Sequence, residues 1–180
     1  MNTQDLSDRT LSNSIVTHVI NAPIEKVDIA DWLLHLPDAE YQRCSHAHIA
    51  AGTTTTDDGQ PMSINVETIG TTLMVQHYVA EIHTPQLCRM VSTSDAISSN
   101  GRTKVHVLWE LSVKALDDKS CEYSNKIHAT ATDDFLAFIA QHGITLAEAH
   151  AARQVASHTH NLEETPNFAK SLERKALGIK

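Results

Sequence analysis

Histidine is the residue type in this chain with the most potential for chemistry. The 180 residues include 12 histidines, and imidazole is both a common metal ligand and a group that titrates near neutral pH. His46 and His48 lie two residues apart, so their side chains would share a face of a strand. His160 and Glu164 have the i, i+4 spacing of neighbours on a helix, but they run into the turn expected after residue 163.

These pairs do not make a metal site. Two ligands are too few for zinc, and neither an HExxH motif nor a pair of closely spaced cysteines supplies the others. Cys44, Cys88 and Cys121 are far apart and odd in number, which indicates reduced thiols in a cytoplasmic protein. The sequence therefore predicts no metal ion and no cofactor.

Two histidines are the candidates for acid–base catalysis. His158 interrupts the apolar stripe of a predicted helix, and His77 shares strand parity with Leu73, Val75 and Val79. Both are expected to face the interior, where an imidazole can act as a general acid or base. The alternative is a core histidine satisfied by a hydrogen-bond partner, which is the commoner role of such a residue.

The remaining composition excludes several classes of function. The chain has no GxSxG nucleophile motif and no glycine-rich phosphate loop. Its net charge is −8 and its basic residues are scattered, so no surface for nucleic acid is expected. No apolar run approaches the roughly 20 residues of a membrane helix, and the polar N-terminus does not resemble a signal peptide. We therefore predict a cytoplasmic protein that binds neither nucleic acid nor membrane.

The elements that must position these residues are mostly strands. Short alternating or β-branched segments, separated by turns such as Asp58-Gly59 and Asn100-Gly101, predict about seven strands joined as an antiparallel sheet. The predicted strands cover residues 14–20, 45–56, 62–69, 71–83, 87–94, 103–115 and 121–131.

Alternation along the strands selects the side chains that share an apolar face. The predicted sets are Met62, Ile64 and Val66; Leu73, Val75 and Val79; Val107 and Trp109; and Tyr123 and Asn125. Such a sheet buries one face and needs helices to cover it.

Two short helices are expected between the first and second strands. An apolar stripe from Ile29 to Leu36 is typical of an amphipathic helix. Pro37 interrupts it, and Asp38 can cap a second short helix that reaches Cys44.

The chain is expected to close with three helices. Thr132 can cap the first, and a capping box at Thr145 and Glu148 opens the second. Pro166, preceded by a threonine, predicts the start of a third. We expect the helix over 145–163 to pack against the sheet. Its stripe runs through Ile144, Ala147, Ala151, Val155, His158 and Leu162.

This order of elements resembles the START-like, SRPBCC helix-grip superfamily. The motif that carries the resemblance is Val19-Ile-Asn-Ala-Pro-Ile-Glu-Lys-Val27, which is similar to the opening of polyketide-cyclase-like and lipid-transfer-like members. The segment from Trp32 to Tyr41 is similar to the helices that follow it. The resemblance covers residues 13–163 by order of elements. It implies an α+β fold in which a curved antiparallel sheet wraps around a C-terminal helix.

The length suits a single domain over residues 1–180, with an irregular lead-in at 1–12. The resemblance implies a cavity between sheet and helix that holds a small apolar or aromatic molecule, and it leaves the oligomeric state open. The residues expected to contact this molecule are Val75, Val107, Trp109, Tyr123, Asn125, Val155 and Leu162.

Ligand binding is the first hypothesis of function, and two alternatives stay open. The chain could be an enzyme of the cyclase, aromatase or hydratase kind that uses His77, His158, Tyr123 or Asn125, or an interaction protein of the co-chaperone kind. A carrier needs volume and apolar walls. An enzyme needs polar groups that converge inside the cavity, and an interaction module needs an exposed apolar patch.

Overall fold

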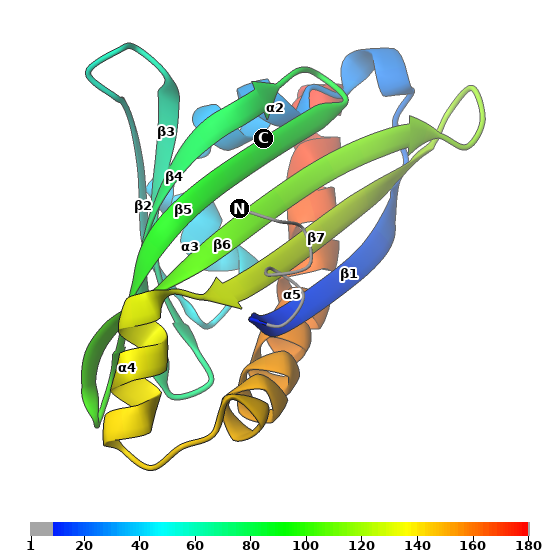
Figure 1. Cartoon of the computed structure of the whole chain (residues 1–180). Helices are drawn as coiled ribbons and strands as arrows, with labels where there is room; N and C mark the ends of the chain where they lie inside the picture. Colours follow the sequence, from blue (N-terminus) through cyan, green and yellow to red (C-terminus); the bar gives the residue numbers. More distant parts are fainter. Residues whose placement is uncertain (1–8, 180) are drawn as a thin grey trace.

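A strongly curved, seven-stranded antiparallel sheet dominates the computed structural model, which describes residues 9–179 (Figure 1). The order across the sheet is β1-β7-β6-β5-β4-β3-β2. The strands are β1 (Thr10–Ile20), β2 (His48–Thr55), β3 (Pro61–Ile69), β4 (Thr72–His83), β5 (Leu87–Ser98), β6 (Gly101–Ala115) and β7 (Cys121–Ala131).

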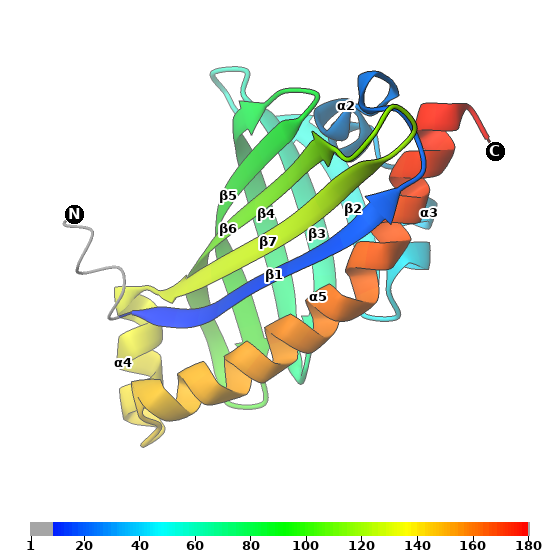
Figure 2. The same cartoon turned by 90° about the vertical axis from the view of Figure 1, so that its right-hand side faces the viewer.

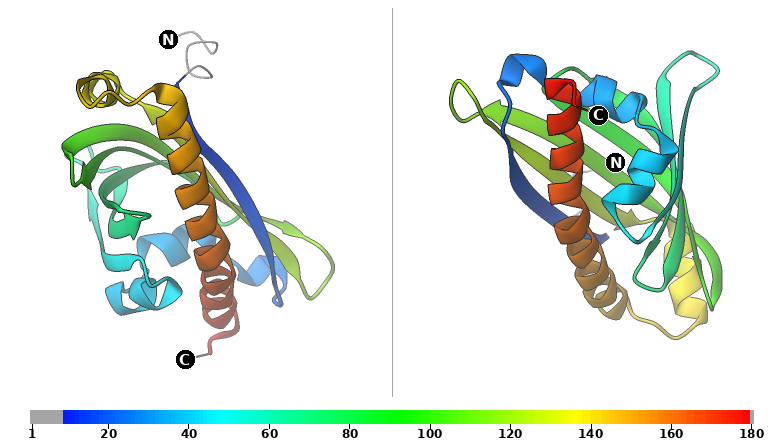
Figure 3. Two further views of the ribbon diagram at one scale, coloured as in Figure 1. Left: turned by 90° about the horizontal axis from the view of Figure 1, so that it is seen from below. Right: turned by 180° about the vertical axis from the view of Figure 1, so that it is seen from behind.

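Helices cover the concave side and one end of this sheet. The long C-terminal helix α5 runs across the concave side along β1 (Figure 2), and α2 and α3 lie beside its C-terminal half (Figure 3). Among residues 9–179, none of the helices combines the length and the apolarity needed to cross a membrane. The helices are η1 (Ile24–Lys26), α2 (Ile29–Leu34), α3 (Asp38–Cys44), α4 (Asp133–Gln141) and α5 (Leu146–Leu177).

The predicted helix-grip α+β fold is therefore confirmed, including the short helices after the first strand. Two of the expected helix caps are confirmed, whereas Asp38 lies in the first turn of α3 without capping it and Thr165 lies inside α5. The side chain of Thr132 accepts a hydrogen bond from the Phe135 amide, and Thr145 and Glu148 form a reciprocal capping box. Local hydrogen bonds of this kind are readable from sequence because both partners lie within one turn.

Several predicted boundaries are wrong, including the end of β5, which was expected at residue 94 and lies at Ser98. The lead-in expected over residues 1–12 falls partly outside the described residues, and β1 already begins at Thr10. The helix expected to stop at residue 163 continues through Pro166 to Leu177. Proline has no amide to donate to Leu162, but Leu162 is half exposed, so water can solvate its carbonyl. Figure 2 shows that the helix bends along its length, as a proline within a helix permits.

The predicted strand faces hold for β6 and β7 and fail for β3 and β4. Val107 and Trp109 are buried on the concave side. On β3 and β4 the burial pattern is the reverse of the prediction, because polar side chains occupy the inward positions and aliphatic ones stay half-buried on the outer face. The inward residues are Ser63, Asn65, Glu67, Met74, Gln76 and Tyr78. The prediction failed for β3 and β4 because it assumed an apolar interior, whereas the part of the interior that these strands face is polar.

Candidate functional site: a pocket above a buried histidine–glutamate cluster

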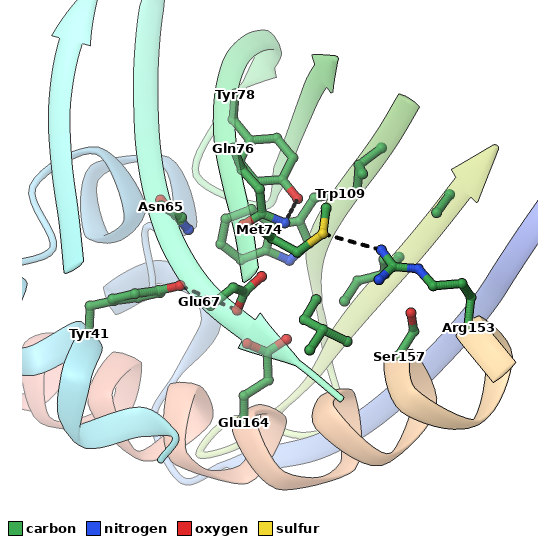
Figure 4. Close-up of a pocket in the computed structure, with 14 residues that line it drawn as sticks. Tyr41, Asn65, Glu67, Met74, Gln76, Tyr78, Trp109, Arg153, Ser157 and Glu164 are labelled. Atoms are coloured by element: carbon green, nitrogen blue, oxygen red, sulfur yellow. Dashed lines mark hydrogen bonds between the residues drawn. The ribbon is translucent and has the colours of Figure 1, made fainter. Parts of the chain in front are cut away.

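A small pocket lies between the concave side of the sheet and α5 (Figure 4). Its volume is about 30 Å³, which is room for about two water molecules. Aromatic rings form part of its wall, and charged or amide side chains form much of the rest. These residues include Tyr41, Tyr78, Trp109, Glu67, Gln76 and Arg153.

Four buried side chains from three elements meet at the floor of this pocket. His48 begins β2, Glu67 lies on β3, and His160 and Glu164 are one turn apart on α5. One nitrogen or oxygen from each of the four lies within 4.8 Å of the others. We call these four residues the His–Glu cluster. Glu67 and Glu164 also line the pocket, so the cluster is open to whatever the pocket binds.

Hydrogen bonds fix the orientation of His48. The backbone carbonyl of Tyr41 accepts a hydrogen bond from His48 Nδ1 at 2.7 Å. The Tyr41 ring stacks on the imidazole with centroids 3.8 Å apart, and its hydroxyl donates to Glu67 Oε2 at 3.3 Å. Because Nδ1 is held by this carbonyl, Nε2 is directed at Glu164 Oε2, 3.2 Å away.

A second set of hydrogen bonds holds the Glu164 carboxylate. Asn125 Nδ2 donates to Glu164 Oε1 at 3.0 Å, and Trp109 Nε1 donates to Asn125 Oδ1 at 2.9 Å. All three side chains are buried. Glu164 Oε2 is thereby left to face the two histidines.

His160 completes the cluster without forming a regular hydrogen bond. Its Nε2 lies 2.9 Å from Glu67 Oε2 and 3.3 Å from Glu164 Oε2. Neither approach has the angle of a hydrogen bond, so Nε2 forms only ion pairs with the two carboxylates, and neither ring nitrogen has a hydrogen-bond partner within the described chain. The imidazole thus points between the two carboxylates rather than at either one.

The cluster carries strong negative potential. Burial alone would raise the pKa of Glu164, but His160 and His48 outweigh burial and lower it. Burial alone would lower the pKa of His160, but Glu164 and Glu67 outweigh burial and raise it. Burial, reinforced by the charges of Glu67 and Glu164, raises the pKa of Tyr78 well above its ordinary value. The site therefore favours a positive charge between its carboxylates.

Arg153 supplies a positive charge from the side of the pocket, and no carboxylate among residues 9–179 forms an ion pair with it. Its Nη2 contacts Met74 Sδ at 3.3 Å, and its Nε has no hydrogen-bond partner in residues 9–179. Desolvation lowers the pKa of Arg153, although Glu67 opposes this effect. Figure 4 shows the guanidinium directed into the pocket from α5.

Four residues predicted to contact a ligand lie in or beside this site. Trp109 and Val107 line the pocket. Asn125 does not line the pocket but donates a hydrogen bond to Glu164, which does. Tyr123 is fully buried on the same face of β7. The sequence predicted the inward face of these four residues correctly, because buried and less buried side chains alternate along β6 and most of β7.

The other predicted contacts lie away from the pocket. Val75 and His77 face outward on β4, and His77 is exposed. On α5, Val155 and Leu162 are exposed, and His158 is exposed with its Nδ1 2.9 Å from Ser14 Oγ on β1. The expected inward placement of these five residues is wrong. On β4 the inward positions are taken by the neighbouring side chains, and on α5 the buried stripe is polar. It includes Ser157, His160, Asn161, Glu164 and Thr165.

The sequence contained one usable signal for the cluster. The i, i+4 spacing of His160 and Glu164 was visible, but the helix was expected to stop at residue 163. Because α5 is continuous through Pro166, both side chains lie on one buried face. The contributions of His48 and Glu67 depend on the packing of distant elements, and no local pattern predicts them.

Solved structures share this architecture. The aromatase/cyclase ZhuI from Streptomyces sp. R1128 is 11% identical, with 93% of this chain and 98% of that chain covered and a TM-score of 0.68. A START superfamily protein from Mycobacterium smegmatis is 13% identical, with 92% and 97% covered and a TM-score of 0.51.

The di-domain aromatase/cyclase StfQ of the steffimycin biosynthetic pathway is 11% identical with a TM-score of 0.64. The match covers 98% of this chain and 55% of that protein, so the chain spans about half of it. No family model and no curated protein matches the sequence. The structural likeness and the topology together show that this chain has the START-like, SRPBCC helix-grip fold.

Proposed function

We propose that this chain is an enzyme that binds a compact aromatic or unsaturated molecule bearing an oxyanion or carbonyl oxygen. The observation that carries the proposal is the guanidinium of Arg153, which donates to the weak acceptor Met74 and has no ion-pair partner among residues 9–179, and which faces the same pocket as the carboxylates of Glu67 and Glu164. A cation on one side and acid–base groups on the floor form the convergent polar set that distinguishes an enzyme site from a carrier cavity.

Arg153 is the group that would hold the ligand oxygen. A thioether is a weak acceptor, so Met74 satisfies the guanidinium poorly. A carboxylate, enolate or polarised carbonyl would replace the sulfur and form charge-assisted hydrogen bonds. The same exchange would separate Arg153 from Met74 and enlarge the pocket for a ligand bigger than its resting volume.

The wall of the pocket suits a flat ligand. The rings of Tyr78 and Trp109 lie 5.3 Å apart and both line the pocket. Aromatic side chains bind planar ligands by stacking or edge contacts. A volume of about 30 Å³ is too small for a carrier of long apolar chains.

Cyclisation, aromatisation and hydration are the reactions that best suit these groups. Each moves protons at carbon or oxygen atoms beside a carbonyl, and buried carboxylates can carry such protons. The aromatase/cyclases with the same fold favour this class only by analogy. We also propose that residues 1–180 act as one domain in the cytoplasm, which the three buried, free cysteines support.

A thermal-shift screen tests the ligand class. Benzoate, salicylate and acetoacetate probe oxyanion recognition, and decanol probes an apolar chain. We expect the oxyanions to raise Tm and Arg153→Met to weaken their binding by roughly 10- to 100-fold, because a charged hydrogen bond is lost. Arg43→Met, at an exposed arginine paired with Glu40, is the matched control and should leave binding unchanged.

Two results would contradict the proposal. One is stabilisation by decanol alone. The other is oxyanion binding that Arg153→Met leaves intact. A separate experiment tests for catalysis. Each compound that binds is incubated with the protein, and mass spectrometry detects whether the compound loses or gains water.

A further inference from the structure

We propose that the His–Glu cluster is a binding site for one divalent transition-metal ion, with Zn²⁺ as the best fit. His48, Glu67, His160 and Glu164 provide two imidazoles and two carboxylates. Imidazole nitrogen and carboxylate oxygen are both ordinary zinc ligands. The site would bind metal whether or not the proposed reaction is right, because it needs no substrate.

The spacing of the four ligand atoms matches a tetrahedral site. A tetrahedron with metal–ligand bonds of about 2.0–2.1 Å has edges of about 3.3–3.4 Å. His48 Nε2 lies 3.5 Å from Glu67 Oε2 and 3.2 Å from Glu164 Oε2. His160 Nε2 lies 2.9 Å and 3.3 Å from the same two oxygens. Four of the six edges are therefore close to the length that zinc requires.

The nitrogen of His160 that faces the carboxylates is an independent observation. The residue is only 5% exposed, and its Nε2 lies at ion-pair distance from both carboxylates without the geometry of a hydrogen bond to either. A buried polar atom that forms no regular hydrogen bond is costly. A metal ion between the carboxylates would displace the proton of His160 and accept the lone pair of Nε2.

The surroundings of the cluster match those of metal ligands. The Tyr41 carbonyl accepts from His48 Nδ1, which directs Nε2 to the cluster. Asn125 holds the remote oxygen of Glu164 and leaves the other oxygen free. Hydrogen bonds of this kind orient histidine and carboxylate ligands in metal sites.

Charge balance favours an ion of charge +2. When the metal displaces the proton of His160, two carboxylates and two neutral imidazoles carry a net charge of −2, which a divalent ion cancels in this buried site. Glu67 and Glu164 line the pocket, so the ion would lie at its floor.

Metal titration tests this site directly. The purified chain is stripped with EDTA, shown to be folded by circular dichroism, and titrated with Zn²⁺ by calorimetry. We expect one ion per chain by elemental analysis. Co²⁺ in place of Zn²⁺ should give the intense visible absorption of tetrahedral coordination, a readout that needs no variant and no activity.

Matched variants locate the ion. His160→Gln and Glu164→Gln should weaken Zn²⁺ binding by more than about 100-fold, which exceeds the effect of losing a supporting hydrogen bond. His158→Gln, an exposed histidine on the same helix, should bind Zn²⁺ like the wild type.

Absence of stoichiometric binding by the folded wild type would overturn the inference, as would binding that His160→Gln leaves unchanged. If Zn²⁺ binds but the oxyanions do not, the metal site stands and the proposed function fails. If the oxyanions bind in an Arg153-dependent way and Zn²⁺ does not bind, the proposed function stands and the metal site fails.

Discussion

At the scale of single residues, Asn125 connects the aromatic wall to the charged floor of the site. Its amide accepts from Trp109 and donates to Glu164, and its backbone carbonyl accepts from Asn161 on α5. One side chain thereby ties β6 and β7 to the helix. Because every partner is buried, its loss would leave donors and acceptors unsatisfied.

We expect Asn125→Ala to lower the free energy of unfolding by about 2–4 kcal/mol, because two buried groups lose their partner. Urea denaturation measures this change. Asn100→Ala, in the exposed turn between β5 and β6, should change stability by less than about 0.5 kcal/mol. Similar losses for the two variants would show that the Asn125 network contributes little.

The cysteines give a second test at this scale. Burial raises the pKa of Cys44 and of Cys88 to about 12, and it raises the pKa of Cys121 as well. The thiolate is the reactive form, so the native protein should react with a thiol reagent only slowly at neutral pH. All three should react at once in denaturant. A rapidly reacting thiol in the native protein would contradict the described burial.

At the scale of elements, α5 decides where the site lies. Its capping box fixes its first turn, and its buried stripe supplies Arg153 to the wall and His160 and Glu164 to the floor. The helix stays continuous through Pro166, so His160 and Glu164 lie on the same buried face of α5.

We expect Thr145→Ala to cost about 1 kcal/mol of stability, because the first turn of α5 loses its side-chain acceptor. Thr159→Ala, at an exposed position within the same helix, is the control for helix propensity. Chemical denaturation of both variants distinguishes the effects. Equal changes would mean that the cap does not stabilise α5.

The sequence was informative wherever structure depends on near neighbours. The turns, the caps at Thr132 and Thr145, and the alternation of β6 and β7 were predicted correctly. Prediction failed where distant elements decide. The inward face of β3 carries Glu67 because its partners lie on β2 and α5. A polar interior reverses the usual apolar pattern, so periodicity pointed to the wrong face of β4 and to the wrong stripe of α5.

At the scale of the whole molecule, the sheet and α5 enclose a pocket, and a contact between Met74 and Arg153 forms part of its wall. Met74 on β4 is fully buried, and its sulfur contacts Arg153 on α5. Both side chains are long and unbranched, so they can move without displacing the backbone. The size of ligand that the pocket accepts should therefore depend on Met74.

We expect Met74→Ala to enlarge the pocket, so that binding shifts from benzoate towards the larger 2-naphthoate. The variant should also lose about 2–5 kcal/mol of stability because a buried side chain is truncated. Met90→Ala on β5 truncates an equally buried methionine that does not line the pocket. It should lose similar stability without changing ligand size, and a shift in both variants would contradict the role of Met74.

The most direct test of the pocket uses the two tryptophans of the chain. Trp109 lines the pocket, whereas the indole of Trp32 donates to Ser171 outside it. Each indole N–H gives its own signal in a nitrogen–proton correlation spectrum, so the spectrum is recorded while salicylate is added. We predict that the Trp109 signal moves to saturation and that the Trp32 signal stays in place. Saturable binding that moves only the Trp32 signal, or neither signal, would contradict the placement of the functional site between the sheet and α5.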